Sequence, residues 1–243
     1  MELERPLLKL LTELEIGSRR NICSAIRQGK VQVNGIVTEN FSYLVETDSD
    51  VVSVDGKQLE LRPAPKVYLM LNKPEGVLST TKDTKNRKTI ISILPEKYRS
   101  LRVYPVGRLD IDSTGLLLLS NDGQLTYKLT HPKFEHEKEY LVLIGKRLQA
   151  KELKKFETGI QLNDGITYPA RIKSLIPPVP FDYSVTIHEG RKRQLHRMFY
   201  ALGYPVIALK RIRMGNLKLG KLEEGRTREL SAYEVAMLLT DIR

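Results

Sequence analysis

The sequence predicts an α+β fold: a mixed, largely antiparallel sheet domain preceded by a small domain of helices and hairpins. Strand-like segments dominate the chain after residue 66 and few helices separate them, which disfavours a parallel, doubly wound sheet. The segment Arg62-Pro63-Ala64-Pro65 suits neither a helix nor a central strand, because each proline lacks an N–H and biases the preceding residue toward extended geometry. We therefore expect a small domain over residues 1–61 and a larger domain over residues 66–243.

The small domain is expected to begin with two helices. Leucines recur at helical spacing over residues 7–14, and Ser18 can cap a second helix with an apolar inner face. The pair Asn34-Gly35 suits the positive φ of a tight turn and predicts a hairpin, and residues 51–56 predict a further strand and turn. Four cations are expected on the outer surface of the second helix: Arg19, Arg20, Arg27 and Lys30.

The larger domain is expected to consist mainly of strands. Apolar or alternating segments predict strands at residues 67–72, 102–106, 115–119, 140–144, 183–187 and 205–209. Apolar residues at helical spacing predict a helix over residues 194–202. A terminal helix is predicted from Ser231 to about residue 239, because Ser231 and Glu234 have the spacing of a capping box.

The composition indicates a soluble protein with an anionic partner. The 243 residues carry a formal net charge of +11 at pH 7. Residues 1–60 have 7 Lys and Arg against 10 Asp and Glu, so the positive excess lies in the rest of the chain, which has 33 against 19. Lys and Arg that neutralise phosphates release condensed counterions, which makes nucleic acid the expected partner. The single cysteine, Cys23, excludes an internal disulfide and a multi-cysteine zinc site.

No segment of the sequence predicts a membrane-spanning or exported protein. The apolar run at residues 116–119 is far shorter than the roughly 20 residues of a transmembrane helix. Residues 1–5 lack the basic start of a signal peptide. We expect a cytoplasmic, monomeric protein with no membrane partner.

The residue that most needs an explanation is Asp110, a carboxylate on a turn between two apolar segments. By spacing alone it is either a turn former or a catalytic group. Asp112 is expected to have a structural or turn role, and Asp122 lies in an Asn-Asp-Gly turn. If the sheet forms a cleft, residues 136–140 and 189–197 converge on Asp110; the alternative for these two segments is strand packing and a solvated basic surface.

The motifs and their order resemble those of two known families. Residues 5–57 resemble the alpha-L RNA-binding domain named after ribosomal protein S four, through Ser18-Arg19-Arg20, residues 26–31 and Val33-Asn34-Gly35. The rest of the chain resembles the RsuA/RluB-type pseudouridine synthases, through Lys73-Pro74-Glu75-Gly76, Gly107-Arg108-Leu109-Asp110, Lys138-Glu139-Tyr140 and residues 189–199. Together the two resemblances cover residues 5–240.

This resemblance implies the pseudouridine synthase fold and an isomerase that converts uridine in RNA to pseudouridine without a metal or cofactor. The implied substrate is ribosomal RNA or a ribosome-assembly intermediate, because the appended RNA-binding module is typical of the members that modify rRNA. Asp110 is then the catalytic carboxylate, and the ring of Tyr140 stacks on the extracted base. The expected RNA-binding residues are Lys73, Arg108, Arg193 and Arg197, together with the four cations of the N-terminal helix.

The chain departs from the family pattern at His196. The family usually has an Arg or Lys there, which pairs with the catalytic carboxylate. A histidine is only partly protonated at pH 7, so its support for Asp110 is expected to be weaker and pH-dependent. Our hypothesis is that His196 pairs with Asp110 as a third catalytic residue, with Arg193, one turn back, as the alternative; Arg197 faces another direction on the helix.

Two other functions compete with this interpretation. A non-catalytic RNA-binding protein that assists ribosome assembly needs neither Asp110 nor Tyr140, so the presence of both favours the enzyme. A hydrolase with Asp110 and Asp112 as paired carboxylates is disfavoured, because we expect the two side chains to point to opposite faces of one strand.

Overall fold

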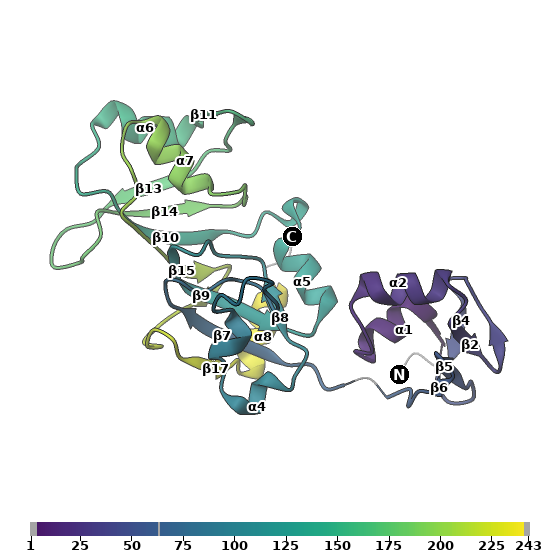
Figure 1. The fold of residues 1–243 in the computed structure, drawn as a ribbon. Helices are drawn as coiled ribbons and strands as arrows, with labels where there is room; N and C mark the ends of the chain where they lie inside the picture. Colours follow the sequence, from purple (N-terminus) through teal and green to yellow (C-terminus); the bar gives the residue numbers. More distant parts are fainter. Residues whose placement is uncertain (1–3, 63, 241–243) are drawn as a thin grey trace. The chain divides into compact units, whose positions relative to one another are not determined.

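The computed structural model describes residues 4–62 and 64–240, drawn as a ribbon in Figure 1. The chain forms two compact units, divided between Lys66 and Val67. Among the described residues, no helix is long and apolar enough to cross a membrane. Each unit has its own core, so the two are described separately.

The N-terminal unit combines two helices with short strands. Helix α1 spans Leu7–Glu13 and α2 spans Arg19–Arg27. The backbone N–H of Asn21 donates to Ser18 Oγ at 3.2 Å, which confirms the predicted cap. The strands are β1 (Glu4–Pro6), β2 (Val31–Val33), β3 (Ile36–Val37), β4 (Leu44–Glu46), β5 (Val52–Val54) and β6 (Lys57–Gln58). They pair in the order β3-β2-β5-β6, with β1 and β4 as a separate pair.

The predicted hairpin turn of this unit is confirmed by the backbone of Asn34 and Gly35, whose φ angles are 52° and 79°. Two successive positive φ values are those of a turn whose twist matches the flanking strands. The leucines of α1 and the inner residues Ile22 and Ile26 of α2 are buried against β2 and β5. This leaves the basic side of α2 exposed.

The larger unit is built on one nine-stranded sheet. Its main path runs β13-β14-β10-β15-β9-β7-β17, while β16 pairs with β15 and β8 with β9. All these pairs are antiparallel except β15 with β9, so the predicted α+β class with a mixed, largely antiparallel sheet is confirmed. The strands are β7 (Tyr68–Lys73), β8 (Tyr104–Val106), β9 (Ser113–Ser120), β10 (Lys138–Leu143), β13 (Arg171–Ser174), β14 (Tyr183–Ile187), β15 (Ala208–Met214), β16 (Leu217–Lys218) and β17 (Thr227–Glu229). A separate hairpin consists of β11 (Gln161–Leu162) and β12 (Gly165–Ile166).

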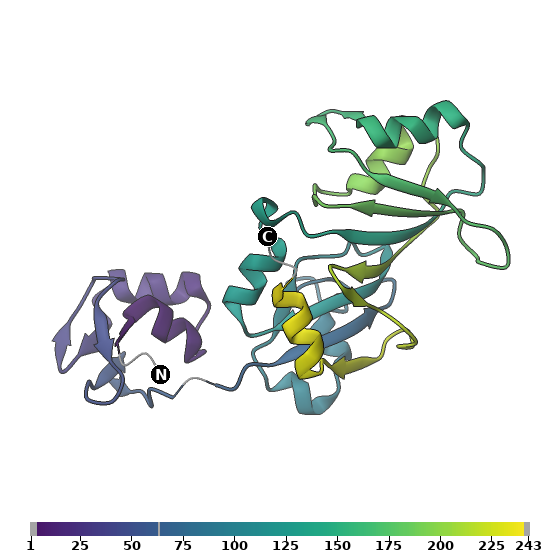
Figure 2. The same ribbon diagram turned by 180° about the vertical axis from the view of Figure 1, so that it is seen from behind.

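Helices cover both faces of this sheet. They are α3 (Ile90–Ile93), α4 (Glu96–Arg99), α5 (Gly123–Thr130), α6 (Ala150–Thr158), α7 (Gln194–Ala201) and α8 (Ala232–Thr240), with a 3₁₀ turn at Pro132–Phe134. Leu117 and Leu119 of β9 belong to the core that includes α6 and α7, whereas Leu116 and Leu118 belong to the core that includes α5 and α8. This division follows from the alternation of side chains along a strand. Helix α8 is in front of the strands in Figure 2 and behind them in Figure 1.

The single parallel pair requires a glycine. Gly115 of β9 lies opposite Arg211 of β15, and its φ is +99°. A Cβ at this position would lie 2.2 Å from the carbonyl oxygen of Arg211, far inside van der Waals contact. Only glycine therefore allows β9 and β15 to approach each other here.

Several elements differ from the prediction. The turn predicted around Asp122 is the start of α5, because Asp122 Oδ1 accepts hydrogen bonds from the backbone N–H groups of Gln124 and Leu125, at 3.0 and 3.2 Å. The strand predicted at residues 205–209 instead spans Ala208–Met214, where it has partners on both sides. The terminal helix is confirmed as α8: Ser231 Oγ accepts from the N–H of Glu234, and the N–H of Ser231 donates to the Glu234 carboxylate.

Candidate active site

A cavity of about 500 Å³ lies in the larger unit. It is lined by the loop before β9, by the start of β10, by the segment that leads into α7, and by part of β15. The candidate residues on its wall are Arg108, Asp110, Tyr140, Arg193 and His196. Of the site residues predicted for the larger unit, Lys73 and Arg197 are not on this wall.

The sheet order explains why these segments meet. Strands β9 and β15 are parallel, so the loops that precede them, including the Asp110 loop, lie at the same edge of the sheet. Strand β10 flanks β15 on the other side, where Tyr140 is opposite Arg211. Helix α7 follows β14, the next strand along, and its first residues line the same cavity. Figure 2 shows these strands side by side in one sheet.

Buried hydrogen bonds fix the backbone around Asp110. Ser79 Oγ donates to the carbonyl of Leu109 at 2.7 Å and accepts from the N–H of the same residue at 3.1 Å. The N–H of Ser113 donates to the carbonyl of Asp110 at 3.1 Å. The side chain of Asp110 remains 35% exposed. The loop therefore presents a carboxylate to the cavity from a rigid backbone.

Lys73 supports this loop through hydrogen bonds to backbone carbonyls. Its ammonium group is fully buried and donates to the backbone carbonyls of Ser113 at 2.7 Å and Pro74 at 3.0 Å. Burial lowers the pKa of Lys73 to about 8, although Asp112 and Asp110 act in the opposite direction. The expectation that Lys73 contacts RNA is wrong, because its polar end points into the protein and bonds to backbone.

Arg193 is the cation nearest to both aspartates. Its Nη1 and Nη2 donate to the two oxygens of Asp112 at 3.0 and 2.7 Å, and Nη1 lies 4.0 Å from Asp110 Oδ2. The hydrogen bonds from Arg193 lower the pKa of Asp112, and those to Asp112 raise the pKa of Arg193. This ion pair keeps Asp112 charged and holds the guanidinium beside Asp110.

The hypothesis that His196 pairs with Asp110 is wrong. His196 Nε2 lies 3.5 Å from Asp112 Oδ2, and Arg193 occupies the position next to Asp110. Arg193 has a left-handed φ of 48° at the start of α7, one turn before His196. Burial, followed by the charge of Arg193, lowers the pKa of His196 below its ordinary value of 6.5. The imidazole is therefore mainly neutral at pH 7. Arg193 supplies the positive charge that the family pattern places one turn later, at position 196.

The expected divergence of Asp110 and Asp112 is also wrong, because both carboxylates approach the same guanidinium. Residues two apart on extended chain share a face, and here the residues between Asp110 and Ser113 form a turn. The two carboxylates differ in their partners: Asp112 is held in a bidentate ion pair, whereas Asp110 has Arg193 only at 4.0 Å. Asp110 is thus the carboxylate that is free to act on a bound molecule.

Two further basic residues line the cavity: Arg211, which the sequence analysis missed, and Lys138, which lies in the segment 136–140 that was expected to converge on Asp110. Arg211 is 2% exposed, donates from Nε to the carbonyl of Leu116 at 2.7 Å, and has Nη1 3.5 Å from the hydroxyl of Tyr140. Lys138 donates to the carbonyl of His136 at 3.2 Å, and burial lowers its pKa to about 8. The available signal for Arg211 was the basic run Lys210-Arg211-Ile212-Arg213, which directly follows the predicted strand.

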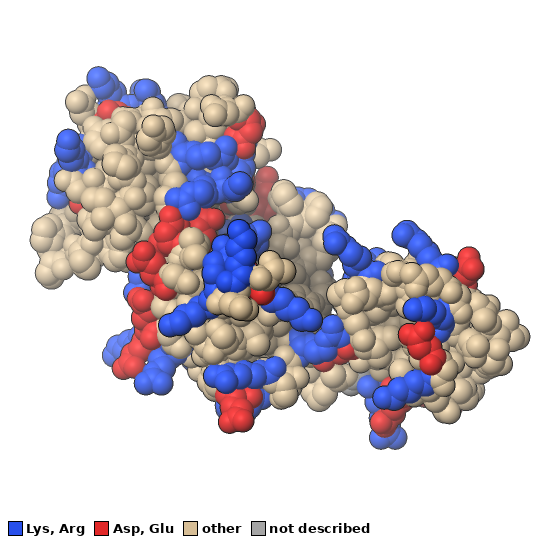
Figure 3. Space-filling model, in the orientation of Figure 1, with Lys and Arg blue, Asp and Glu red and all other residues tan. Residues whose placement is uncertain are grey.

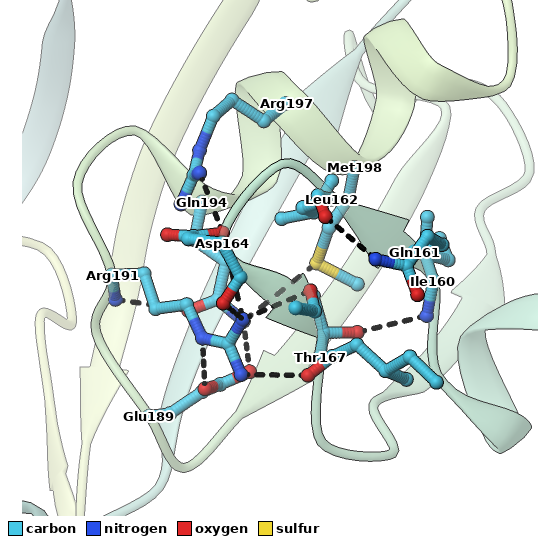
Figure 4. A network of polar contacts seen from close by, with 12 residues as sticks. Ile160, Gln161, Leu162, Asp164, Thr167, Glu189, Arg191, Gln194, Arg197 and Met198 are labelled. Carbon is cyan, nitrogen blue, oxygen red and sulfur yellow. Dashed lines mark hydrogen bonds and ion pairs between the residues drawn. The ribbon is translucent and has the colours of Figure 1, made fainter.

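A polar network joins the β11–β12 hairpin to α7, as Figure 4 shows. Arg191 donates to Glu189 at 2.9 Å and to the carbonyls of Gly165 and Ile166 at 3.1 and 2.7 Å. Arg197 forms an ion pair of 2.9 Å with Asp164 on the hairpin. Arg197 therefore links two structural elements, and its expected contact with RNA stays a prediction.

The remaining predicted cations lie at the surface. Arg108 is exposed at the cavity, and Figure 3 shows Lys and Arg side chains gathered over the larger unit between patches of Asp and Glu. In the N-terminal unit all four predicted cations are exposed: Arg19, Arg20, Arg27 and Lys30. Arg27 lies over the ring of Phe41, 5.6 Å from its centroid, and Lys30 is 3.7 Å from Asp55.

Comparison with known proteins identifies this arrangement. A family model described as RNA pseudouridylate synthase matches residues 67–201, more than half of the chain. The chain belongs to this family. A second model, the S4 domain, matches residues 5–52, so both resemblances deduced from the sequence are confirmed. The protein is an RNA pseudouridine synthase, an isomerase, with an S4-type RNA-binding domain at its N-terminal end.

Relatives of this synthase match over nearly their whole length. A Bacillus subtilis (strain 168) protein named ribosomal large subunit pseudouridine synthase B is 44% identical over 236 residues, which cover 96% of this chain and 94% of the relative. An uncharacterized RNA pseudouridine synthase of Aquifex aeolicus (strain VF5) is 40% identical and covers 95% and 92%. A crystal structure of a pseudouridylate synthase aligns with a TM-score of 0.69 at 33% identity, covering 96% of this chain and 98% of that one.

Proposed function

We propose that this synthase isomerises a uridine of large-subunit ribosomal RNA and that Asp110 is its catalytic carboxylate. The observation that carries the proposal is the position of Asp110: a partly exposed carboxylate on a hydrogen-bonded loop, in a cavity that is also lined by the ring of Tyr140 and by four arginines. The name of the Bacillus subtilis relative supports large-subunit rRNA as the substrate.

The chemistry needs a group that acts on the ribose or the base. The bond from ribose C1′ to N1 breaks, the base turns, C1′ bonds to C5, and the C5 proton is replaced by one at N1, so the reaction is balanced without an oxidant or a reductant. The carboxyl group of Asp110 supplies a nucleophile or a base for this step. Arg193 lies 4.0 Å away and offsets its charge.

The uridine must leave its helix to reach this carboxylate. An extracted base is held by stacking on an aromatic ring. Tyr140 fits this role because its ring lies on the cavity wall and the buried guanidinium of Arg211 supports its hydroxyl. The exposed basic side chains of α2 and the exposed side chain of Arg108 are suited to bind phosphates of the RNA.

The experiment is site-resolved mapping of pseudouridine in rRNA, by carbodiimide modification and reverse transcription. Cells that lack the protein are compared with cells rescued by wild type, by Asp110→Asn, or by Asp122→Asn as a control carboxylate outside the cavity. We expect one uridine of large-subunit rRNA to lose its mark and only wild type and the control to restore it. Restoration by Asp110→Asn would reject the catalytic assignment, and an unchanged rRNA map with defective ribosome assembly would favour the non-catalytic assembly factor.

A further inference from the structure

We propose that Tyr168 and His188 form a stacking platform at the rim of the cavity, for an unpaired RNA base next to the target uridine. The inference rests on the proposed function, because it assigns a further part of the RNA that the enzyme modifies. His188 lines the cavity, and its ring centroid lies 5.0 Å from that of Tyr168, with the ring planes inclined by 54°. Tyr168 itself is 56% exposed.

The backbone of Tyr168 is tied to the active-site segment. Its N–H donates to Glu189 Oε1 at 3.0 Å. The same carboxylate accepts from Gln194 Nε2 at 2.6 Å and from Arg191 Nε at 2.9 Å, in the network of Figure 4. Gln194 is the first residue of α7, the helix that carries His196. The backbone from which the exposed ring projects is thus held in a fixed relation to the cavity, and this segment does not have to be ordered when RNA binds.

Extraction of the uridine explains why a platform is useful at this rim. The flipped nucleotide leaves its neighbours without a stacking partner, and an aromatic ring restores part of the lost energy. Stacking on a ring is tolerant of sequence, because every base has a π-face. Lys192, exposed and on the wall of the same cavity, provides a cation for the phosphate of the stacked nucleotide. A single-stranded segment of RNA matches this combination of aromatic rings and one cation.

The test measures the affinity of the full chain for large-subunit rRNA transcribed in vitro, by filter binding over a range of salt concentrations. Tyr168→Ala is compared with Tyr168→Phe, which keeps the ring, and with Tyr200→Ala, a matched change at a tyrosine that is 76% exposed on α7. We expect Tyr168→Ala to raise Kd about tenfold, within the range for loss of one stacked base. The slope of log Kd against log salt is expected to stay constant, because no charge is removed. Tyr168→Phe and Tyr200→Ala are expected to bind like wild type.

An unchanged Kd in Tyr168→Ala, or an equal loss in Tyr168→Phe or Tyr200→Ala, would overturn the platform. Thermal melting of each variant shows whether its fold is intact. If Tyr168→Ala lowers both the affinity and the melting temperature, the comparison is repeated with His188→Ala, which removes the other ring. Pseudouridine formed in the same transcript is counted separately. Wild-type protein that binds but forms none rejects the proposed function, whereas the binding comparison still decides the platform.

Discussion

Replacing Arg193 by alanine is expected to slow catalysis far more than replacing His196. Arg193 Nη1 lies 4.0 Å from Asp110, and unit charges at this distance interact by about 4 kcal/mol at the effective dielectric constant near a protein surface. Both side chains are more than one-third exposed, so we reduce this figure to about 2 kcal/mol for solvent screening. If the transition state depends on this interaction, the rate falls about 30-fold in Arg193→Ala.

His196→Ala is expected to lower the rate less than about threefold at pH 7.5. Burial and the charge of Arg193 lower the pKa of His196 below 6.5, so the imidazole is neutral at this pH and offers no charge to remove. The imidazole gains a proton beside Asp112 only at a pH below its ordinary pKa of 6.5, and only there do the pH profiles of wild type and His196→Ala diverge.

The assay is the single-turnover release of tritium from RNA labelled at C5 of uridine, with the enzyme in excess. Arg193→Lys is the matched variant, because it keeps the charge but loses the two parallel hydrogen bonds to Asp112, and we expect it to retain more activity than Arg193→Ala. Equal losses in Arg193→Ala and His196→Ala at pH 7.5 would refute this reasoning. It would also fail if His196→Ala lost activity increasingly between pH 7 and 8.

Three other changes have defined outcomes. Gly115→Ala places a Cβ 2.2 Å from the carbonyl oxygen of Arg211 and is expected to lower the free energy of unfolding in urea by at least about 2 kcal/mol. Gly203→Ala is the control, because Gly203 has positive φ but open space around it, and we expect a loss of about 1 kcal/mol. Equal losses would contradict the steric argument. The pKa of Lys73 is about 8 in the folded chain, against its ordinary value of 10.5. Between pH 8 and 10.5 the unfolded chain therefore binds more protons than the folded chain, and the free energy of unfolding rises with pH. Lys73→Met is expected to reduce that rise between pH 8 and 9.5, and an unchanged slope would show that Lys73 is charged in the fold. The triple change of Arg19, Arg20 and Lys30 to Ala is expected to reduce the salt slope of RNA binding by about 2, whereas Asp110→Ala leaves it constant; equal slopes would remove α2 from the interface.

Local sequence rules predicted the features that depend on a few neighbouring residues. The cap of α2 at Ser18, the Asn34-Gly35 turn and the capping box of α8 were all predicted and confirmed. Each needs only the hydrogen-bonding capacity or φ preference of residues within three positions. The loop that carries Asp110 was found in the same way, as a polar turn between two apolar segments.

Features that depend on residues far apart in the chain were not predictable. Lys73 was expected to contact RNA, but its ammonium group donates to the carbonyl of Ser113, 40 residues away, as well as to that of the adjacent Pro74, and the pairing of β7 with β9 buries it there. Arg211 was missed because the predicted strand ended at residue 209, whereas β15 pairs with β9 as far as Arg211 and with β10 as far as Met214. Arg193 was named only as the alternative partner of Asp110, because no local preference indicates the left-handed start of α7 that places it there.

The fold class, the two-part organisation suggested by the proline-rich linker, and the family were predictable from the amino-acid sequence, because each of them depends on composition, periodicity or motif order. The tertiary structure decided which charges meet. Asp110, Asp112 and Arg193 are brought together by a parallel strand pair that only Gly115 permits. The physical reason is that electrostatic interactions depend on distance in space and on burial, and both are fixed by packing between segments that lie about 80 residues apart in the chain.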